Sequence, residues 1–130
     1  MEYKQDVVDE KGRNILIETV IAFLNTNKGS ILLGINDDGT IAGTHTNGED
    51  IQKMIHDCCD PPPTNLRMEE KTIEGNKIII IDVAEGNDKP YQSKRDKNWY
   101  VRHKATDMRM ERSELMKFVE GRRASVWQNL

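Results

Sequence analysis

The chain has 130 residues, the length of one domain with a single hydrophobic core. Its 19 Lys and Arg stand against 22 Asp and Glu, a formal net charge of -3, which excludes binding to nucleic acid through an overall basic surface. Such binding would need a local basic patch on an acidic body, and with aromatic residues at only 5% the core has to be mainly aliphatic.

The first half of the chain predicts a helix between strands. Residues 3–8 are a candidate short strand, and residues 13–26 place apolar side chains at helical spacing. The continuous apolar run 30–36 predicts a strand that is covered on both faces. Asp-Asp-Gly-Thr at 37–40 predicts a hairpin turn, after which residues 41–43 begin a return strand.

The second half predicts a helix, three strands and a closing helix at residues 49–59, 66–73, 77–83, 99–102 and 111–121. Because strands and helices do not alternate strictly, we expect an α+β fold, a single domain with one mixed β-sheet and about three helices. We assign this domain to residues 1–121, where Gly121 can end the last helix, and a C-terminal tail to residues 122–130.

Cysteine usage and the N-terminus indicate a reducing, cytoplasmic environment. Cys58 and Cys59 are adjacent and cannot cross-link distant parts of a fold. Met1–Lys4 is charged from the start, unlike a secretory signal, and no apolar run approaches the roughly 18 residues that span a bilayer. With three histidines and two cysteines at unsuitable spacings, we expect no zinc site, and we expect no cofactor.

Two glycines, Gly29 and Gly34, have the spacing of a phosphate-binding loop. That loop continues with Lys and Ser or Thr and opens a helix, whereas Ile35 and Asn36 follow here and the glycines bracket a predicted strand. We therefore expect no hydrolysis of nucleoside triphosphates.

Acidic residues offer a second candidate site. Glu2, Asp37 and Asp38, with Glu18, could hold a divalent metal for phosphodiester cleavage if the fold brought them together. The alternative for Asp37 and Asp38 is a structural role, because Asp and Gly are favoured in hairpin turns for backbone reasons. The turn interpretation is the simpler one.

The segment from Lys89 to Arg112 is the main candidate site. It holds eight basic and three acidic residues, a local charge of +5, which leaves -8 on the rest of the chain. Basic side chains contact phosphates, and the interleaved Tyr91, Trp99 and Tyr100 offer rings that can stack on bases. The alternative is a solvated edge strand, with Trp99 in the core. The residues that we expect to bind nucleic acid are Lys4, Lys94, Arg95, Lys97, Trp99, Arg102 and Lys104.

Five motifs in a shared order make the chain resemble the Schlafen AlbA-type domain. They are Glu-Tyr-Lys at 2–4, Ile-Ala-Phe-Leu-Asn-Thr at 21–26, the glycine-bounded stretch with its turn at 29–39, Lys-Pro-Tyr at 89–91 and Tyr-Val-Arg at 100–102. The resemblance implies an α+β fold that binds DNA or RNA, and bacterial members are often described as transcriptional regulators. It also implies a regulatory domain of a longer chain.

Some animal members of that family cleave RNA with three acids. The first of these positions would precede Met1, the second matches Glu2, and the third is Asn36 here. We therefore favour a nucleic-acid-binding module over an enzyme. A divalent-metal-dependent ribonuclease using Glu2, Asp37 and Asp38 is the first alternative. A dimerisation or protein-interaction domain, whose charges only keep it soluble, is the second. We also expect self-association, because animal relatives place two such domains side by side and a homodimer would recreate that pair.

Overall fold

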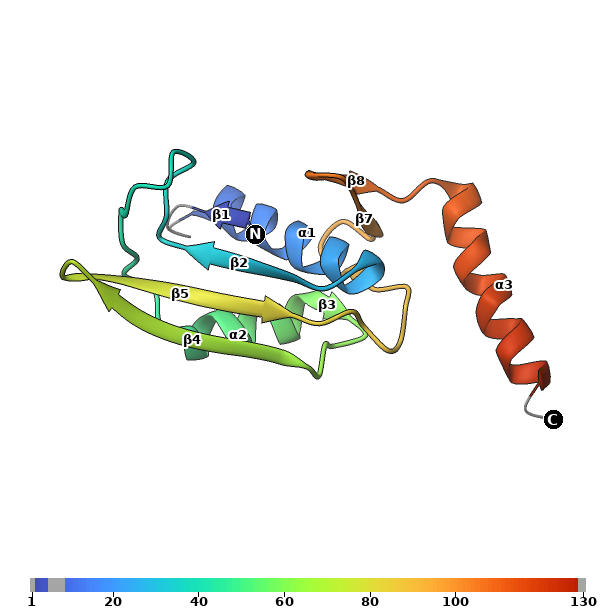
Figure 1. Cartoon of the computed structure of the whole chain (residues 1–130). Coiled ribbons are helices and arrows are strands. Elements are labelled where there is room, and N and C mark those ends of the chain that lie inside the picture. The colour runs from blue at the N-terminus through green and yellow to red at the C-terminus, as the bar shows by residue number, and fades with distance from the viewer. Residues whose placement is uncertain (1, 5–8, 129–130) are drawn as a thin grey trace.

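The computed structural model describes residues 2–4 and 9–128 (Figure 1). Its central sheet has the strand order β1-β2-β5-β4, with a parallel β1–β2 pair and antiparallel pairs elsewhere. These four strands are β1 (Glu2–Lys4), β2 (Gly29–Leu33), β4 (Leu66–Ile73) and β5 (Asn76–Val83). The helices are α1 (Glu10–Thr26), α2 (Gly48–Cys58) and α3 (Arg112–Gln128). The predicted α+β class, with a mixed sheet and three helices, is confirmed.

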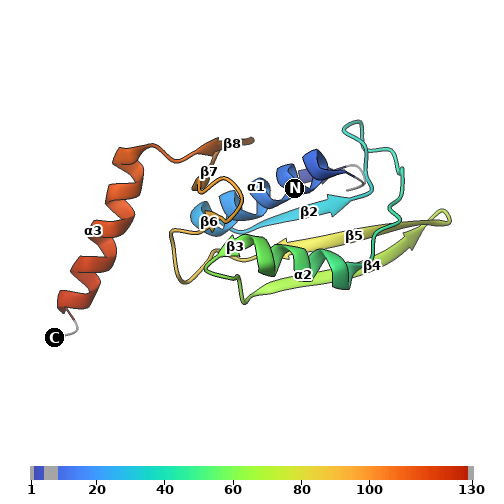
Figure 2. The same ribbon diagram turned by 180° about the vertical axis from the view of Figure 1, so that it is seen from behind.

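Two small antiparallel pairs complete the fold. One joins β3 (Cys59–Asp60) to β6 (Gln92–Ser93), and the other joins β7 (Tyr100–His103) to β8 (Thr106–Arg109). Both views show β7 and β8 beside α1 and at the start of α3, which projects away from the sheet (Figures 1 and 2). The basic segment of the sequence therefore runs along one end of the domain.

Several predicted boundaries are wrong. Residues 41–43 form no strand, and Ile41 makes only an isolated bridge to Ile35. Strand β8 was not predicted, and α3 runs past Gly121 to Gln128, through residues expected as a tail. Of the predicted strand 3–8, residues 5–8 lie outside the described part of the chain.

Helix α1 is the centre of the core. It begins at Glu10, earlier than predicted, because the Asp9 side chain accepts a hydrogen bond from the backbone N of Gly12 at 2.7 Å and caps the helix. From Leu16 to Asn25 every residue except Glu18 is buried. The sheet packs on one side of the helix and β7 on another, so its apolar residues are not confined to a single stripe.

Strand β5 lies in the middle of the sheet, as predicted, but β2 is not covered on both faces. Ile31, Leu33, Ile79 and Ile81 point to the helices and are fully buried. In β2, Leu32 points to the opposite face and is half-buried. We call that face, which no helix of the described chain covers, the open face (Figure 1).

One buried side chain joins α1 to the basic segment. The Asn25 amide donates to the backbone oxygens of Tyr91 and Tyr100, both at 2.9 Å, and its Oδ1 accepts from the backbone N of Tyr91 at 2.6 Å. Asn25 is 2% exposed, so bulk water cannot readily replace its side chain as the hydrogen-bond partner of these backbone groups. The end of α1 thereby fixes the chain on both sides of the loop between β6 and β7.

We predict that Asn25→Ala lowers the free energy of unfolding by about 2–4 kcal/mol, because three buried backbone groups lose their partner. Asn87→Ala is the matched control, since Asn87 is exposed and has no hydrogen bond among the described residues. Denaturant titrations followed by circular dichroism measure both changes. Equal losses in the two variants would contradict the role assigned to Asn25.

Candidate nucleic-acid interface

Arg102, on β7, lies at the centre of a charged network. Its guanidinium nitrogens lie 2.5 Å from Glu2 Oε2 and 2.7 Å from Asp107 Oδ1, and its side chain is only 12% exposed. The guanidinium also lies 5.0 Å from the centroid of the Phe23 ring. Burial by itself lowers the pKa of Arg102, but the hydrogen bonds to Glu2 and Asp107 outweigh burial and raise it. Arg102 is therefore a charged residue whose charge is offset by two carboxylates.

The network connects distant parts of the chain. Asp107 Oδ2 accepts a 2.6 Å hydrogen bond from the hydroxyl of Thr19, which is fully buried in α1. At the other end, Lys4 Nζ lies 3.8 Å from Glu2 Oε1. Strand β1, helix α1 and the β7–β8 hairpin are thus tied together through Arg102, so this residue positions the hairpin.

Beside this network lies a hollow of about 430 Å³. We call it the lysine hollow, and it is lined in part by Glu2, Phe23, Thr26, Lys28, Arg102 and Lys104. Lys28 and Lys104 are exposed, and neither has a carboxylate partner among the described residues. Two uncommitted ammonium groups beside a hydroxyl and a guanidinium suit the oxygens of a phosphate.

Lys104 occupies an unusual backbone position. It lies in the turn between β7 and β8 with a φ of 59°, and Lys97 has a φ of 61°. Residues with a side chain rarely adopt such angles, which suit glycine. A lysine at the tip of this hairpin therefore costs stability while it places an ammonium group at the edge of the lysine hollow.

The loop between β6 and β7 holds three more of the predicted basic residues. Arg95 Nη2 lies 3.6 Å from Glu18 Oε1 and 3.3 Å from Asp96 Oδ2, so its charge is partly offset. Lys94 and Lys97 are exposed and have no ion pair among the described residues. None of the three basic residues lines the lysine hollow.

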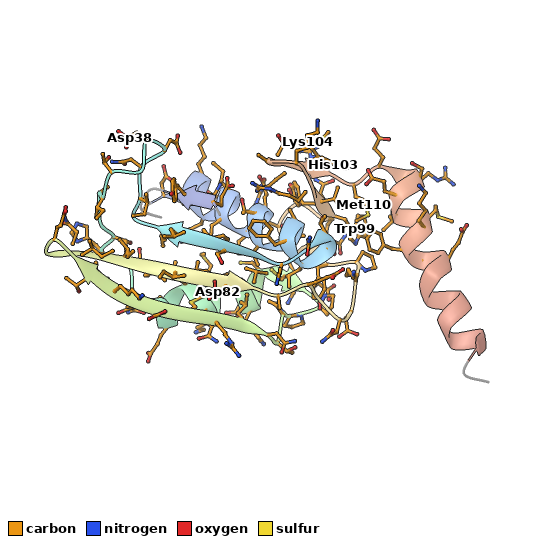
Figure 3. The ribbon with its side chains drawn as sticks, viewed as in Figure 1. Asp38, Asp82, Trp99, His103, Lys104 and Met110 are labelled. Atoms are coloured by element: carbon orange, nitrogen blue, oxygen red, sulfur yellow. The ribbon has the colours of Figure 1, made fainter. Side chains whose placement is uncertain are left out.

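The aromatic residues of the basic segment have different environments. Tyr91 and Tyr100 are 3% and 4% exposed, so both belong to the core and the expectation that Tyr91 stacks on bases is wrong. Burial, together with the hydrogen bond that its hydroxyl donates to Asp96, raises the pKa of Tyr100. Trp99 is half-buried, and its backbone oxygen accepts from Met110 N at 2.5 Å beside the start of α3 (Figure 3).

The acidic candidates do not gather in one place. Asp38 Oδ1 accepts from Thr40 Oγ1 at 2.6 Å and from Thr40 N at 2.9 Å, and these bonds lower the pKa of Asp38. Asp37 is exposed in the same turn, whereas Glu2 faces Arg102. In the part of the chain that the structure describes, no three His, Cys, Asp or Glu side chains are grouped to hold a metal ion. The turn interpretation of Asp37 and Asp38 therefore fits the geometry.

The glycine pair has a structural explanation. Gly29 begins β2, where a β-carbon would lie 2.4 Å from the Phe23 ring. Gly34 has a φ of +98° and a backbone N that donates to Lys4 O at 2.8 Å. A turn follows Gly34 instead of a helix, so the helix N-terminus that a phosphate-binding loop requires is missing here.

Lys28 is the residue of this site that sequence reasoning missed. It lies between α1 and β2, far along the chain from the basic segment, and its neighbours Asn25, Thr26 and Asn27 indicate only a turn. No local pattern relates it to Lys104, because their proximity arises from the packing of α1 against β7.

Comparison with known proteins agrees with a small α+β domain. The chain belongs to the Schlafen AlbA_2 family, whose model matches residues 1–111. No curated protein matches the chain significantly. None of the described helices combines the length and apolar character needed to cross a membrane.

Two solved structures share the fold. The DIP2311 protein of Corynebacterium diphtheriae is 19% identical with a TM-score of 0.73, and the match covers 90% of this chain but 23% of that one. The N-terminal domain of a Nitrosomonas europaea protein, named as related to the ATP-dependent DNA helicase RecG, is 24% identical with a TM-score of 0.54. That match covers 85% of this chain and 82% of the other.

We predict that Lys104→Gly raises the free energy of unfolding by up to about 1 kcal/mol, because glycine adopts a positive φ without a steric penalty. Glu74→Gly is the matched comparison, since Glu74 has a φ of 53° in the turn between β4 and β5. Thermal unfolding should show a higher midpoint for both variants. A lower midpoint for Lys104→Gly would mean that its side chain stabilises the hairpin.

Proposed function

We propose that this domain binds nucleic acid through backbone phosphates, as a module of a regulatory protein. The observation that carries the proposal is the lysine hollow, which Lys28, Lys104 and Arg102 line together. Lys104 has a backbone conformation that suits glycine, and this supports the same view. The strain is accounted for if the ammonium group of Lys104 binds a ligand.

The other predicted residues extend the proposed surface. Lys94 and Lys97 would add phosphate contacts from the loop before β7, and Lys4 would add one beside Glu2. Arg95 and Arg102 are already paired with carboxylates, so we assign them a smaller share of the affinity and, for Arg102, the task of holding the hairpin. Trp99 would stack its exposed part on an unpaired base.

Family membership supports DNA as the first polymer to test. The Nitrosomonas europaea neighbour is named for a DNA helicase, and a domain with the same fold would serve there, or in a transcriptional regulator, to hold a strand. RNA presents the same phosphates, so it belongs in the same experiment. The alternative of a metal-dependent ribonuclease is weaker. Glu2 forms an ion pair with Arg102, and in the described part of the chain it is not grouped with Asp37 and Asp38 in a way that could hold a metal ion.

We predict that Lys28→Ala/Lys104→Ala weakens binding to all sequences alike and reduces the log–log salt dependence of the affinity by about two, since each phosphate contact contributes roughly -0.9. Lys11→Ala/Lys53→Ala removes the same charge from exposed positions on α1 and α2 and should change the slope little. Fluorescence anisotropy with duplex DNA, single-stranded DNA and RNA, at several salt concentrations, measures both.

The result that would contradict the proposal is equal affinity and equal slope for both double variants and the parent protein. Ribonuclease activity is examined in the same samples by adding Mg²⁺ or Mn²⁺ and following cleavage of the RNA. Cleavage that Glu2→Gln abolishes would instead favour the enzyme.

A second candidate is self-association through α3. Met116 and Val119 are 42% and 40% exposed, and the helix extends away from the sheet in both views (Figures 1 and 2). A helix of this length is marginally stable in water without a packed apolar face, so a second copy would stabilise it. We predict a concentration-dependent dimer that Val119→Lys disrupts, measured by analytical ultracentrifugation. A monomer at high micromolar concentration would contradict this.

A further inference from the structure

A second pocket, of about 870 Å³, lies on the open face of the sheet. We call it the sheet-face pocket, and the residues of it that matter here are Lys28, Ser30, Asn65, Leu66, Arg67 and Asp82. Its volume falls in the range of small-ligand sites. Lys28 lines both this pocket and the lysine hollow, so the two cavities share this residue.

The floor of the sheet-face pocket is a row of three polar side chains. Ser30 on β2 is opposite Asp82 on β5, which is opposite Arg67 on β4. Residues opposite each other on adjacent strands point to the same face, and this face is turned away from the helices because the neighbouring Ile31 and Ile81 are in the core. Figure 3 shows Asp82 on this side of the sheet.

The hydrogen-bonding capacity of this row is largely unused. Asp82 Oδ1 accepts from the Ser30 hydroxyl at 2.6 Å, and Oδ2 has no donor among the described residues. Arg67 is directly opposite Asp82, yet its side chain makes no ion pair or hydrogen bond with the described chain, and the side chain of Asn65 makes none either. A carboxylate thus lies beside a guanidinium and an amide, all three available to a ligand.

The pocket also has an apolar part, which Leu66 and the β-carbon of Ala84 provide beside the polar row. An aromatic ring suits such a surface, and its polar edge can meet the polar row. Guanine is the base whose Watson–Crick edge places two N–H donors side by side, which matches one carboxylate, while its O6 and N7 accept from an arginine. In a duplex that edge is already paired, so only an unpaired base can enter.

We propose that the sheet-face pocket binds one unpaired guanine nucleotide of a single strand. Asp82 accepts from N1–H and the 2-amino group, Arg67 donates to O6 or N7, and Lys28 holds the phosphate that continues into the lysine hollow. This assignment rests on the proposed function and adds the strand type and a base preference to it.

The experiment compares fluorescein-labelled ten-nucleotide DNA strands of thymidine with a single central dG, dI, dA, dC or dT. The parent protein should bind the dG strand about tenfold more tightly than the dT strand, as one good bidentate contact allows. Inosine lacks the 2-amino group and should fall between them. Annealing the dG strand to its complement should remove the preference.

Two variants locate the preference. Asp82→Asn keeps the acceptor for Ser30 and should bring the dG and dT strands to similar affinity, and Arg67→Gln, at an exposed position, should do the same in part. Glu69→Gln is the control, because Glu69 lies on the same face of β4 as Arg67 but is not part of the pocket. Thermal unfolding identifies any variant that does not fold.

The outcomes separate the two proposals. Equal affinity of the parent protein for all five strands, or a dG preference that survives both Asp82→Asn and Arg67→Gln, would overturn the guanine pocket and leave phosphate binding standing. No binding to any strand at low salt would overturn both. A dG preference lost in Asp82→Asn and kept in Glu69→Gln would support the pocket.

Discussion

The amide of Asn25 is the contact on which the candidate site depends. An α-helix ordinarily presents only side chains to its surroundings, and here one of those side chains binds the backbone of two other segments at once. Tyr91 and Tyr100 flank the loop that contains Lys94, Lys97 and Trp99, so the position of that loop is set by the end of α1. Because Asn25 is buried, the bonds are shielded from water, and the loop is fixed without a regular sheet around it.

The basic segment contains two kinds of cationic side chain, those paired with carboxylates and those exposed without such a partner. The arginines Arg95 and Arg102 are paired with carboxylates from α1, β1 and β8, and they hold the segment against the domain. Lys94, Lys97 and Lys104 are exposed and carry no carboxylate partner in the described chain, whereas Lys89 is paired with Glu85. The two arginines suit this task, because a planar guanidinium presents five donors in a fixed fork, whereas an ammonium group on a flexible stem acts as a compact point charge.

The sequence predicts those features that depend on local periodicity. The apolar spacing in α1, the central place of β5 and the turn at Asp37 and Asp38 are all observed, because each follows from neighbours in the chain. The family was also recognisable, from motifs such as Tyr100–Arg102 that the fold brings into contact with Glu2 and Asn25.

Features that depend on tertiary packing were not predictable in this way. A count of charges treats Arg102 and Lys104 as equivalent, although only the first has two carboxylate partners, one of them about a hundred residues away on β1. Lys28 has no basic neighbour, and it joins the site only because the turn after α1 meets the β7–β8 hairpin. The sequence offers Tyr91 as a stacking ring because it lies among basic residues, yet its ring packs so tightly against Gly86 that a β-carbon there would lie 2.1 Å from it.

The positive φ of Lys104 has a consequence for protein engineering. A selection for thermal tolerance, or a consensus drawn from turn statistics, would replace this lysine with glycine. The replacement would raise the stability of the domain. The resulting variant would be more stable, but it would lack one of the two unpaired ammonium groups of the lysine hollow. Optimising this scaffold without a ligand present would therefore remove a proposed phosphate contact, and the turn between β7 and β8 is the first place where this would happen.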